Sequence, residues 1–365
     1  MASLYDRFVS IPSGRHETYF AGANGGDGFR SDYDRVLSEE HFDRIYIIKG
    51  GPGVGKSTAM RRCSAAAERI GAEVTELRCG SDADSLDLVV MEKNGCRAAV
   101  LDGTAPHTRD PKYPGAAAEI VDFGRAWSRS KLEGMRDEII SEAKKKSDAF
   151  ADAYRLLSIS KSLRRDSLRL VTRALDQSKM HAAALRALGK VGAENECGSV
   201  SFRHADGITM NGAYSLDTPE KLAVKNVYVS DDYMSGALFI AELYSVAATE
   251  RITATVLVSP LDDEIYRGIY FPSCGAYFGI ARTDAAKPDI NMMRFLSPVS
   301  LAEVRGRRRA SDKLALAAFD EALLRLGEAR EHHFALERMY GSATDYGIVD
   351  ELTASLVADV VERLK

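Results

Sequence analysis

An apolar run that leads into a glycine-rich loop most constrains how this chain can fold. Residues 44–58 read Arg-Ile-Tyr-Ile-Ile-Lys-Gly-Gly-Pro-Gly-Val-Gly-Lys-Ser-Thr. Ile45 to Ile48 predict a short strand buried on both faces of a parallel sheet, and residues 57–70 predict a helix. A strand, a glycine loop and a helix in direct succession predict an α/β fold in which helices flank a parallel sheet.

The glycine-rich segment matches the spacing G-x-x-x-x-G-K-S of a phosphate-binding P-loop. Glycines let backbone N–H groups surround phosphate oxygens, and the start of the following helix favours an anion. We expect Lys56 to contact the β- and γ-phosphates and Ser57 to bind Mg²⁺. The alternative is a glycine turn that binds nothing. The predicted nucleotide-binding residues are Gly50, Gly51, Pro52, Gly53, Val54, Gly55, Lys56, Ser57 and Thr58.

Charge and composition narrow the class of protein. The 365 residues include 49 basic and 53 acidic side chains, and a net charge of −4 argues against bulk electrostatic capture of nucleic acid. No apolar run is long enough to span a bilayer, and the first residues lack the layout of a secretion signal, so a soluble cytoplasmic protein without a membrane partner is expected. The five scattered cysteines include no C-x-x-C pair, which favours reduced thiols.

The second half of the sequence contains a weak copy of the first. Residues 44–70 align without gaps with residues 226–252, at an offset of 182 (226 − 44), and Phe20 aligns with Phe202. At this offset, Gly55, Lys56 and Ser57 become Ala237, Leu238 and Phe239, and Lys49-Gly50 becomes Asp231-Asp232. Carboxylates repel phosphate, so we expect a duplicated domain whose second loop binds no triphosphate. It is then either a structural partner or a pseudo-site that regulates the first.

Carboxylates follow two further strands predicted in the first half. Residues 73–78 predict a strand that leads to Asp82, Asp84 and Asp87, and Asp84 is the candidate general base or Mg²⁺-linked carboxylate among them. Such runs also form turns and helix caps. Residues 88–101 predict a hairpin that turns at Asn94-Gly95 and ends at Asp102. We expect Asp102 to hold Mg²⁺; otherwise it is a capping or turn residue.

The polar loop 103–115 is placed to hold a second substrate. His107 could position water there, and Arg109 or Lys112 could neutralise transferred charge, although each residue type is also ordinary in loops. The predicted catalytic residues are Lys56, Asp102, Asp84 and His107, and the predicted metal ligands are Ser57 and Asp102.

These motifs together resemble a little-characterised family of bacterial tandem P-loop ATPase-like proteins. The resemblance lies in the segments 48–58, 82–87, 102–107 and 110–115, and it takes in residues 20–24 and the later helices. Membership implies a P-loop NTPase fold, ATP binding and ATPase activity. The chain departs from the family pattern at Ala83, where a proline is usual, and in its degenerate second P-loop.

Long helical arms are predicted after each half. Apolar residues from Leu132 to Leu157 recur at helical spacing and predict a helical hairpin over residues 131–190. Four basic residues at four-residue spacing form one face, which is either balanced by local acids, a lid that reaches the phosphates or a patch for an acidic partner: Lys161, Arg165, Arg169 and Arg173. The run Arg305 to Arg309 could be a simple loop.

The predicted organisation has four parts. These are a P-loop domain (1–130), a helical hairpin arm (131–190), a degenerate P-loop-like domain (191–300) and a C-terminal helical arm (301–365).

The leading prediction is an NTPase that hydrolyses Mg·ATP at one competent site and changes the position of its arms. ATP and Mg²⁺ are the expected cofactors. The alternatives are a kinase that transfers phosphate to a small molecule or nucleotide, and a non-catalytic nucleotide sensor or scaffold. The second substrate or protein partner is not identified by sequence, and nucleic acid is a less favoured partner.

Overall fold

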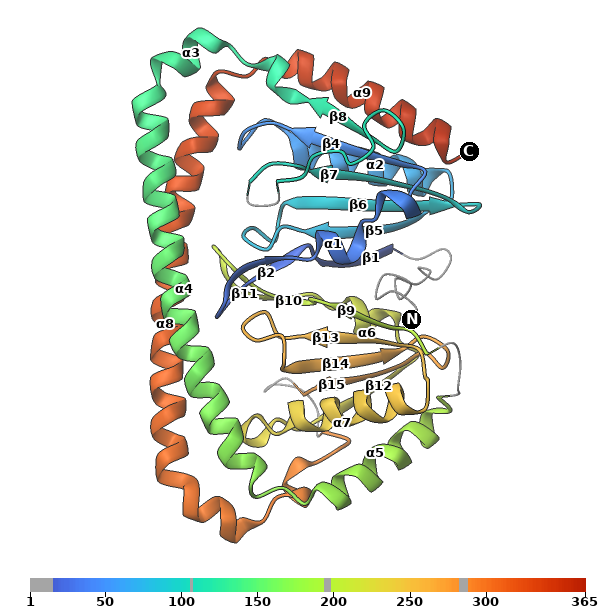
Figure 1. Ribbon diagram of the computed structural model, residues 1–365, viewed down its shortest axis with the longest axis vertical. Helices are drawn as coiled ribbons and strands as arrows, with labels where there is room; N and C mark the ends of the chain where they lie inside the picture. The colour runs from blue at the N-terminus through green and yellow to red at the C-terminus, as the bar shows by residue number, and fades with distance from the viewer. Residues whose placement is uncertain (1–15, 106–107, 194–197, 282–287) are drawn as a thin grey trace.

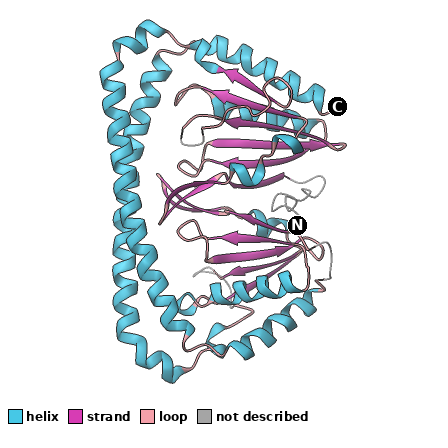
Figure 2. Ribbon diagram, viewed as in Figure 1, coloured by secondary structure: helices cyan, strands magenta, loops and turns pink. Residues whose placement is uncertain are grey.

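Two mixed sheets and a pair of long helices make up the protein. The computed structural model describes residues 16–105, 108–193, 198–281 and 288–365. The sheets lie one beyond the other, and both long helices run past the same side of the two sheets (Figure 1). Figure 2 shows that further helices cover the two outer ends of this arrangement. None of the described helices is long and apolar enough to cross a membrane.

The first sheet has six strands, and only β6 runs antiparallel to its neighbours. Their order across the sheet is β1 (His16–Phe20), β5 (Glu73–Arg78), β6 (Leu86–Lys93), β7 (Cys96–Asp102), β4 (Arg44–Lys49) and β8 (Ala118–Asp122). The predicted hairpin is confirmed, because Asn94 (φ 52°) and Gly95 (φ 80°) form the turn between β6 and β7. Helix α2 (Lys56–Arg69) follows β4, as the sequence predicts.

The second sheet repeats this strand order. It contains β12 (Lys225–Val229), β15 (Ala276–Ile280), β14 (Tyr266–Phe271), β13 (Ala254–Val258) and β9 (Val200–Arg203). Where β4 pairs with β8 in the first sheet, the second has an isolated parallel bridge between Val229 and Ile290. Helix α7 (Gly236–Thr249) follows β12 as α2 follows β4. Short helices α1 (Tyr33–Val36) and α6 (Thr218–Leu222) complete the two halves.

The halves meet through two small hairpins, each of which contacts the opposite half. One hairpin is β2 (Gly22–Gly25) with β3 (Gly28–Ser31), and the other is β10 (Asp206–Thr209) with β11 (Gly212–Ser215). The N–H of Gly26 donates to the carbonyl of Leu261 at 3.0 Å, and the N–H of Met210 donates to that of Ser81 at 2.8 Å. Each hairpin therefore fixes the loop after β5 or β13 of the other half.

The helical arms are exchanged between the halves. Helix α3 (Arg129–Gly134) leads from the first half into α4 (Arg136–Thr172), and α8 (Pro298–Ser342) leaves the second half. The two long helices are antiparallel, and their apolar stripes meet in one cluster that includes Ala153, Leu157, Ala322 and Leu326. Helix α5 (Gln177–Val191) then packs on α7, whereas α9 (Tyr346–Arg363) packs on α2.

The prediction of a self-contained hairpin over residues 131–190 is therefore wrong. The stripe of α4 is buried against α8, and α5 turns away to cover the second sheet (Figure 1). Equivalent backbone bonds anchor both crossovers, because Ser128 N–H donates to Ala343 and Ser297 N–H donates to Ala174, both at 2.8 Å.

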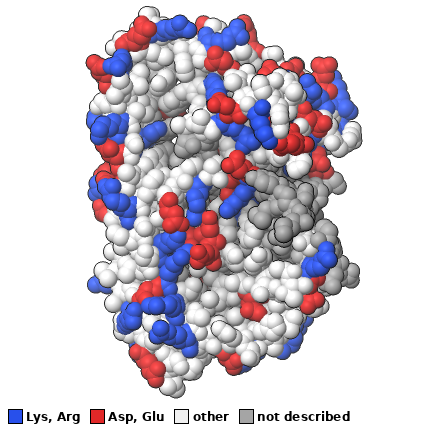
Figure 3. Space-filling model, viewed as in Figure 1, with Lys and Arg blue, Asp and Glu red and all other residues white. Residues whose placement is uncertain are grey.

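Local acids balance most of the predicted basic face. Lys161 pairs with Asp27 at 2.5 Å, Arg165 with Asp262 and Arg169 with Asp166. The run Arg305 to Arg309 lies within α8 and not in a loop. Figure 3 shows blue and red side chains next to one another along this part of the long helices.

A buried histidine joins the two halves. His204 is 1% exposed, and its Nδ1 lies 2.6 Å from Asp32 Oδ2 of the first half. Its Nε2 lies 3.6 Å from Asp263. Burial opposes the imidazolium, but Asp263 and Asp32 outweigh burial and raise the pKa of His204 to about 9. The charged form is therefore the native one at neutral pH.

We expect truncation of α9 side chains to destabilise the first half. Leu356 is 3% exposed and belongs to the core around α2, so Leu356→Ala should lower the free energy of unfolding by about 2–5 kcal/mol. Leu324→Ala on α8 is the control, because Leu324 is 61% exposed and should cost under about 0.5 kcal/mol. Urea denaturation measures both, and equal effects would contradict the assignment of α9 to this core.

The His204 network should make stability fall in alkaline solution. Because the folded pKa exceeds the unfolded value of 6.5, its contribution is full below pH 6.5 and is lost as the pH rises through about 9. The loss is on the order of 3 kcal/mol at most. Urea denaturation between these pH values should show the decline in the wild type and not in His204→Gln. His181→Gln, at an exposed site on α5, should retain the decline.

Candidate functional site

The glycine-rich loop connects the carboxyl end of β4 to the first residue of α2. Gly53 and Gly55 have φ values of 71° and 96°, which side chains with a Cβ rarely adopt. Helix α2 begins directly after Gly55, so the first backbone N–H groups of the helix face the loop. Residues 50–58 thus have the strand–loop–helix placement that the sequence predicts.

Lys56 is folded back over its own loop. Its Nζ donates to the carbonyl oxygens of Gly51 at 2.7 Å and Gly50 at 3.0 Å, and it lies 3.3 Å from Asp102 Oδ2. The Lys56 side chain is 11% exposed. A mostly buried ammonium above a glycine loop is a cation held where an anion can reach it.

Asp102 reaches this ammonium because β7 is the neighbour of β4. Asp102 is in register with Ile48, the penultimate residue of β4. Thr104 donates to Asp102 Oδ1 through its backbone N–H at 2.9 Å and its hydroxyl at 2.5 Å, which leaves Oδ2 toward Lys56. The hydroxyl of Tyr33 also donates to the Asp102 carbonyl at 3.1 Å. The carboxylate is thereby oriented before any ligand binds.

Ser57 and Asp102 fit the modest protein ligand set that Mg²⁺ requires. Ser57 Oγ accepts a hydrogen bond from Leu86 N–H at 2.9 Å, which orients the hydroxyl at the start of α2. In the described ranges, no three His, Cys, Asp or Glu side chains form a metal-binding group. Mg²⁺ usually takes one or two protein oxygens and completes its shell with phosphate and water, so this donor set is compatible with the ion.

Other predicted site residues lie elsewhere or have other contacts. Asp84 is exposed, and its carbonyl accepts a hydrogen bond from Arg61 on α2; across the described ranges, its carboxylate has no bond to the loop. His107 lies outside the described residues. Arg109 pairs with Asp34 at 3.1 Å, and Lys112 pairs with Glu40 at 2.5 Å. Sequence reasoning therefore placed Asp84, Arg109 and Lys112 nearer the phosphate loop than the structure does.

The exchanged arm from the second half covers the loop. A Cβ on Gly51 would lie 2.9 Å from the ring of Tyr340, and one on Gly53 would lie 2.9 Å from the carbonyl oxygen of Glu337. The Tyr346 hydroxyl donates to the carbonyl of Gly53 at 3.0 Å. The last turns of α8 and the start of α9 thus pack directly on the glycines of the loop.

A second lysine approaches from α4. Burial lowers the pKa of Lys146, and the like charge of Lys56 lowers it further, although Cys79 and Glu337 oppose these effects. The hydrogen bond from His333 lowers the pKa of Glu337, and Lys56 and Lys146 add to this shift despite partial burial. Lys146 and Glu337 were missed because helical periodicity does not identify the residues that reach another domain.

The equivalent loop of the second half differs from the gapless alignment. Helix α7 begins at Gly236 where α2 begins at Lys56 (236 − 56 = 180), and Arg251 has the left-handed conformation of Gly71 (251 − 71 = 180). The offset is therefore 180 at the helix, and the predicted replacements of Gly55, Lys56 and Ser57 by Ala237, Leu238 and Phe239 are wrong by two positions. Their structural counterparts are Ser235, Gly236 and Ala237.

The chemical prediction for this loop nevertheless agrees with its contacts. Asp231 Oδ1 accepts the N–H of Gly236 at 3.2 Å, so a carboxylate of the protein occupies the start of α7. Ile280 pairs with Val229 where Asp102 pairs with Ile48. The second loop therefore has neither the ammonium nor the metal-binding carboxylate of the first.

Comparison with known proteins gives no matching family model, no matching curated protein and no matching solved structure. The resemblance to tandem P-loop ATPase-like proteins stays a prediction that rests on the quoted motifs.

Proposed function

We propose that the protein is a P-loop NTPase that binds Mg·ATP at a single site formed by residues 50–58. The observation that carries this proposal is the position of Lys56, whose ammonium lies among the Gly50 and Gly51 carbonyls and Asp102 Oδ2. These partners hold the cation directly over the glycine loop and the start of α2. A triphosphate bound there would accept the ammonium and the backbone N–H groups in their place.

Each residue has a distinct role in this proposal. The backbone N–H groups of the loop bind phosphate oxygens, and Lys56 neutralises the β- and γ-phosphates. Ser57 and Asp102 hold Mg²⁺, which supplies further charge neutralisation at the phosphates when it is bound. Asp102 has a second function without nucleotide, because it pairs with Lys56 and limits the cost of a buried unpaired ammonium.

The arm adds groups from outside the first sheet. Lys146 of α4 is a second cation near Lys56, and Tyr340 and Tyr346 contact the glycines whose N–H groups would bind phosphate. A change of loop conformation on binding must therefore be transmitted to the end of α8 and the start of α9. This contact supports the proposal that nucleotide binding or hydrolysis alters the position of the arms.

Removal of Lys56 should abolish nucleotide binding. Lys56→Ala eliminates the ammonium, and we expect Mg·ATP affinity to fall at least about a hundredfold in calorimetric titration. Asp102→Asn should weaken Mg²⁺-dependent binding more than binding measured in EDTA. Lys190→Ala, an exposed lysine on α5, is the matched control. Unchanged affinity in Lys56→Ala would refute the proposal.

Product analysis separates the three candidate reactions. Purified protein with Mg·ATP should release ADP and free phosphate without an acceptor if it is an ATPase. ADP formation that depends on an added small molecule or nucleotide would identify a kinase. Tight ATP binding without turnover, alone or with candidate partners, would identify a sensor.

Nucleotide binding should also reach the arm. We expect Mg·ATP to slow amide hydrogen exchange in residues 337–349 of the wild type, because these residues pack on the loop that binds phosphate. The Lys56→Ala variant should show no such change. Exchange in α5, which covers the other sheet, serves as the internal reference, and equal slowing there would argue against a local contact.

A further inference from the structure

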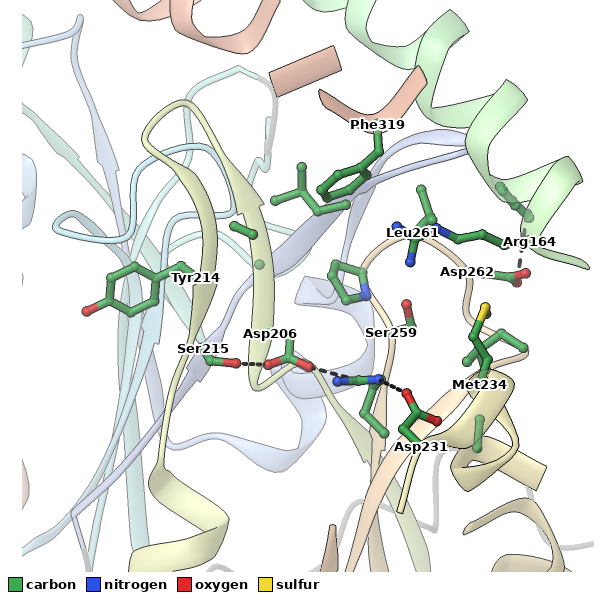
Figure 4. Close-up of a pocket in the computed structure, with 18 of the residues that line it drawn as sticks. Arg164, Asp206, Tyr214, Ser215, Asp231, Met234, Ser259, Leu261, Asp262 and Phe319 are labelled. Carbon is green, nitrogen blue, oxygen red and sulfur yellow. Dashed lines mark hydrogen bonds and ion pairs between the residues drawn. The ribbon is translucent and has the colours of Figure 1, made fainter. Parts of the chain in front are cut away.

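A cavity of about 340 Å³ lies at the corresponding end of the second half. Its walls come from the β10–β11 hairpin, the loops after β12 and β13, and the two long helices (Figure 4). The volume is at the small end of the range for organic ligands. The lining combines apolar groups such as Ile208, Leu261 and Phe319 with charged groups from both sides.

Arg164 of α4 is the cation of this cavity that lacks an ion pair. Its guanidinium lies over the ring of Phe319, 5.2 Å from the centroid, and no carboxylate of the described ranges lies within ion-pair distance. Its neighbours differ: Lys161 pairs with Asp27, and Arg165 pairs with Asp262. A guanidinium stacked on a ring keeps its N–H edge free for a planar oxyanion.

Arg267 provides a second cation on the opposite wall. Its guanidinium is 3.5 Å from Asp206 and 3.7 Å from Asp231, beyond direct hydrogen-bond distance (Figure 4). Burial lowers the pKa of Arg164, and the like charge of Arg267 adds to this shift. Two arginines that repel each other across a cavity are both stabilised by an anion between them.

The anion would not bind as a phosphate binds a P-loop. Asp231 already accepts the N–H of Gly236 at the start of α7, and burial raises the pKa of this carboxyl group. The cationic groups come instead from α4 and β14. The second half has thus lost the loop chemistry and carries an anion-binding arrangement on its arm.

We propose that this cavity binds a small organic anion, in which a phosphate or carboxylate group contacts Arg164 and Arg267 and an apolar body lies against Phe319 and Leu261. The site is separate from the proposed nucleotide site, and neither the loop 50–58 nor its ligand takes part in it. Phosphate esters and carboxylic acids share the required chemistry.

The test uses the full chain with Lys56→Ala, so that the first loop does not compete for phosphate. Phenyl phosphate, benzoate and the uncharged benzyl alcohol are titrated separately, and binding is followed by ligand-observed NMR. We expect saturable binding of at least one of the two anions and none of benzyl alcohol. The anion that binds more tightly distinguishes a phosphate ligand from a carboxylate ligand.

Second-site variants assign the binding to the cavity. Arg164→Gln should weaken the anion at least about tenfold, because charge-assisted hydrogen bonds are lost. Arg267→Gln should also weaken it, and Arg164→Lys should retain part of the affinity. Arg155→Gln, on the exposed face of α4, is the matched control and should bind normally. Circular dichroism melting confirms that each variant is folded.

Two results would overturn the proposal. One is the absence of binding by both anions to the folded Lys56→Ala protein. The other is equal affinity in the Arg155→Gln control and in whichever of Arg164→Gln and Arg267→Gln is folded.

Discussion

The antiparallel packing of α4 against α8 is the contact on which the rest of the structure depends. Helix α4 has 37 residues and is about 55 Å long, so one helix passes from the first half to the second. Its small and apolar side chains, with those of α8, form a buried seam. Because each helix leaves one half and continues into a helix that covers the other, this seam fixes α5 on α7 and α9 on α2.

The two loops show how similar backbones can have opposite electrostatics. In the first, a lysine begins the helix and an aspartate ends the neighbouring strand, so a cation is held over the loop. In the second, glycine and isoleucine stand at those places, and Asp231 itself accepts the helix N–H. The shared framework sets where charges can lie, and a few side chains decide their sign.

Local features of the fold were predictable from sequence, and contacts between distant segments were not. The strand before Gly50, the helix after it and the turn at Asn94-Gly95 depend on neighbouring residues, and all three are confirmed. An apolar stripe on α4 indicates that one face is buried but not which element buries it. The gapless alignment was wrong by two positions at α7 because alanine-rich helices align at several offsets, and Arg251 conceals the helix end that Gly71 marks.

The exchanged arms have a consequence for how the chain folds during translation. The core of the first half includes Val349, Leu356 and Val360, which leave the ribosome last. Until then the apolar face of α2 lacks its cover, although the rest of that sheet has long been made. Such late, non-local contacts slow folding and expose aggregation-prone surface. The first half is therefore the part of the nascent chain that most needs a chaperone.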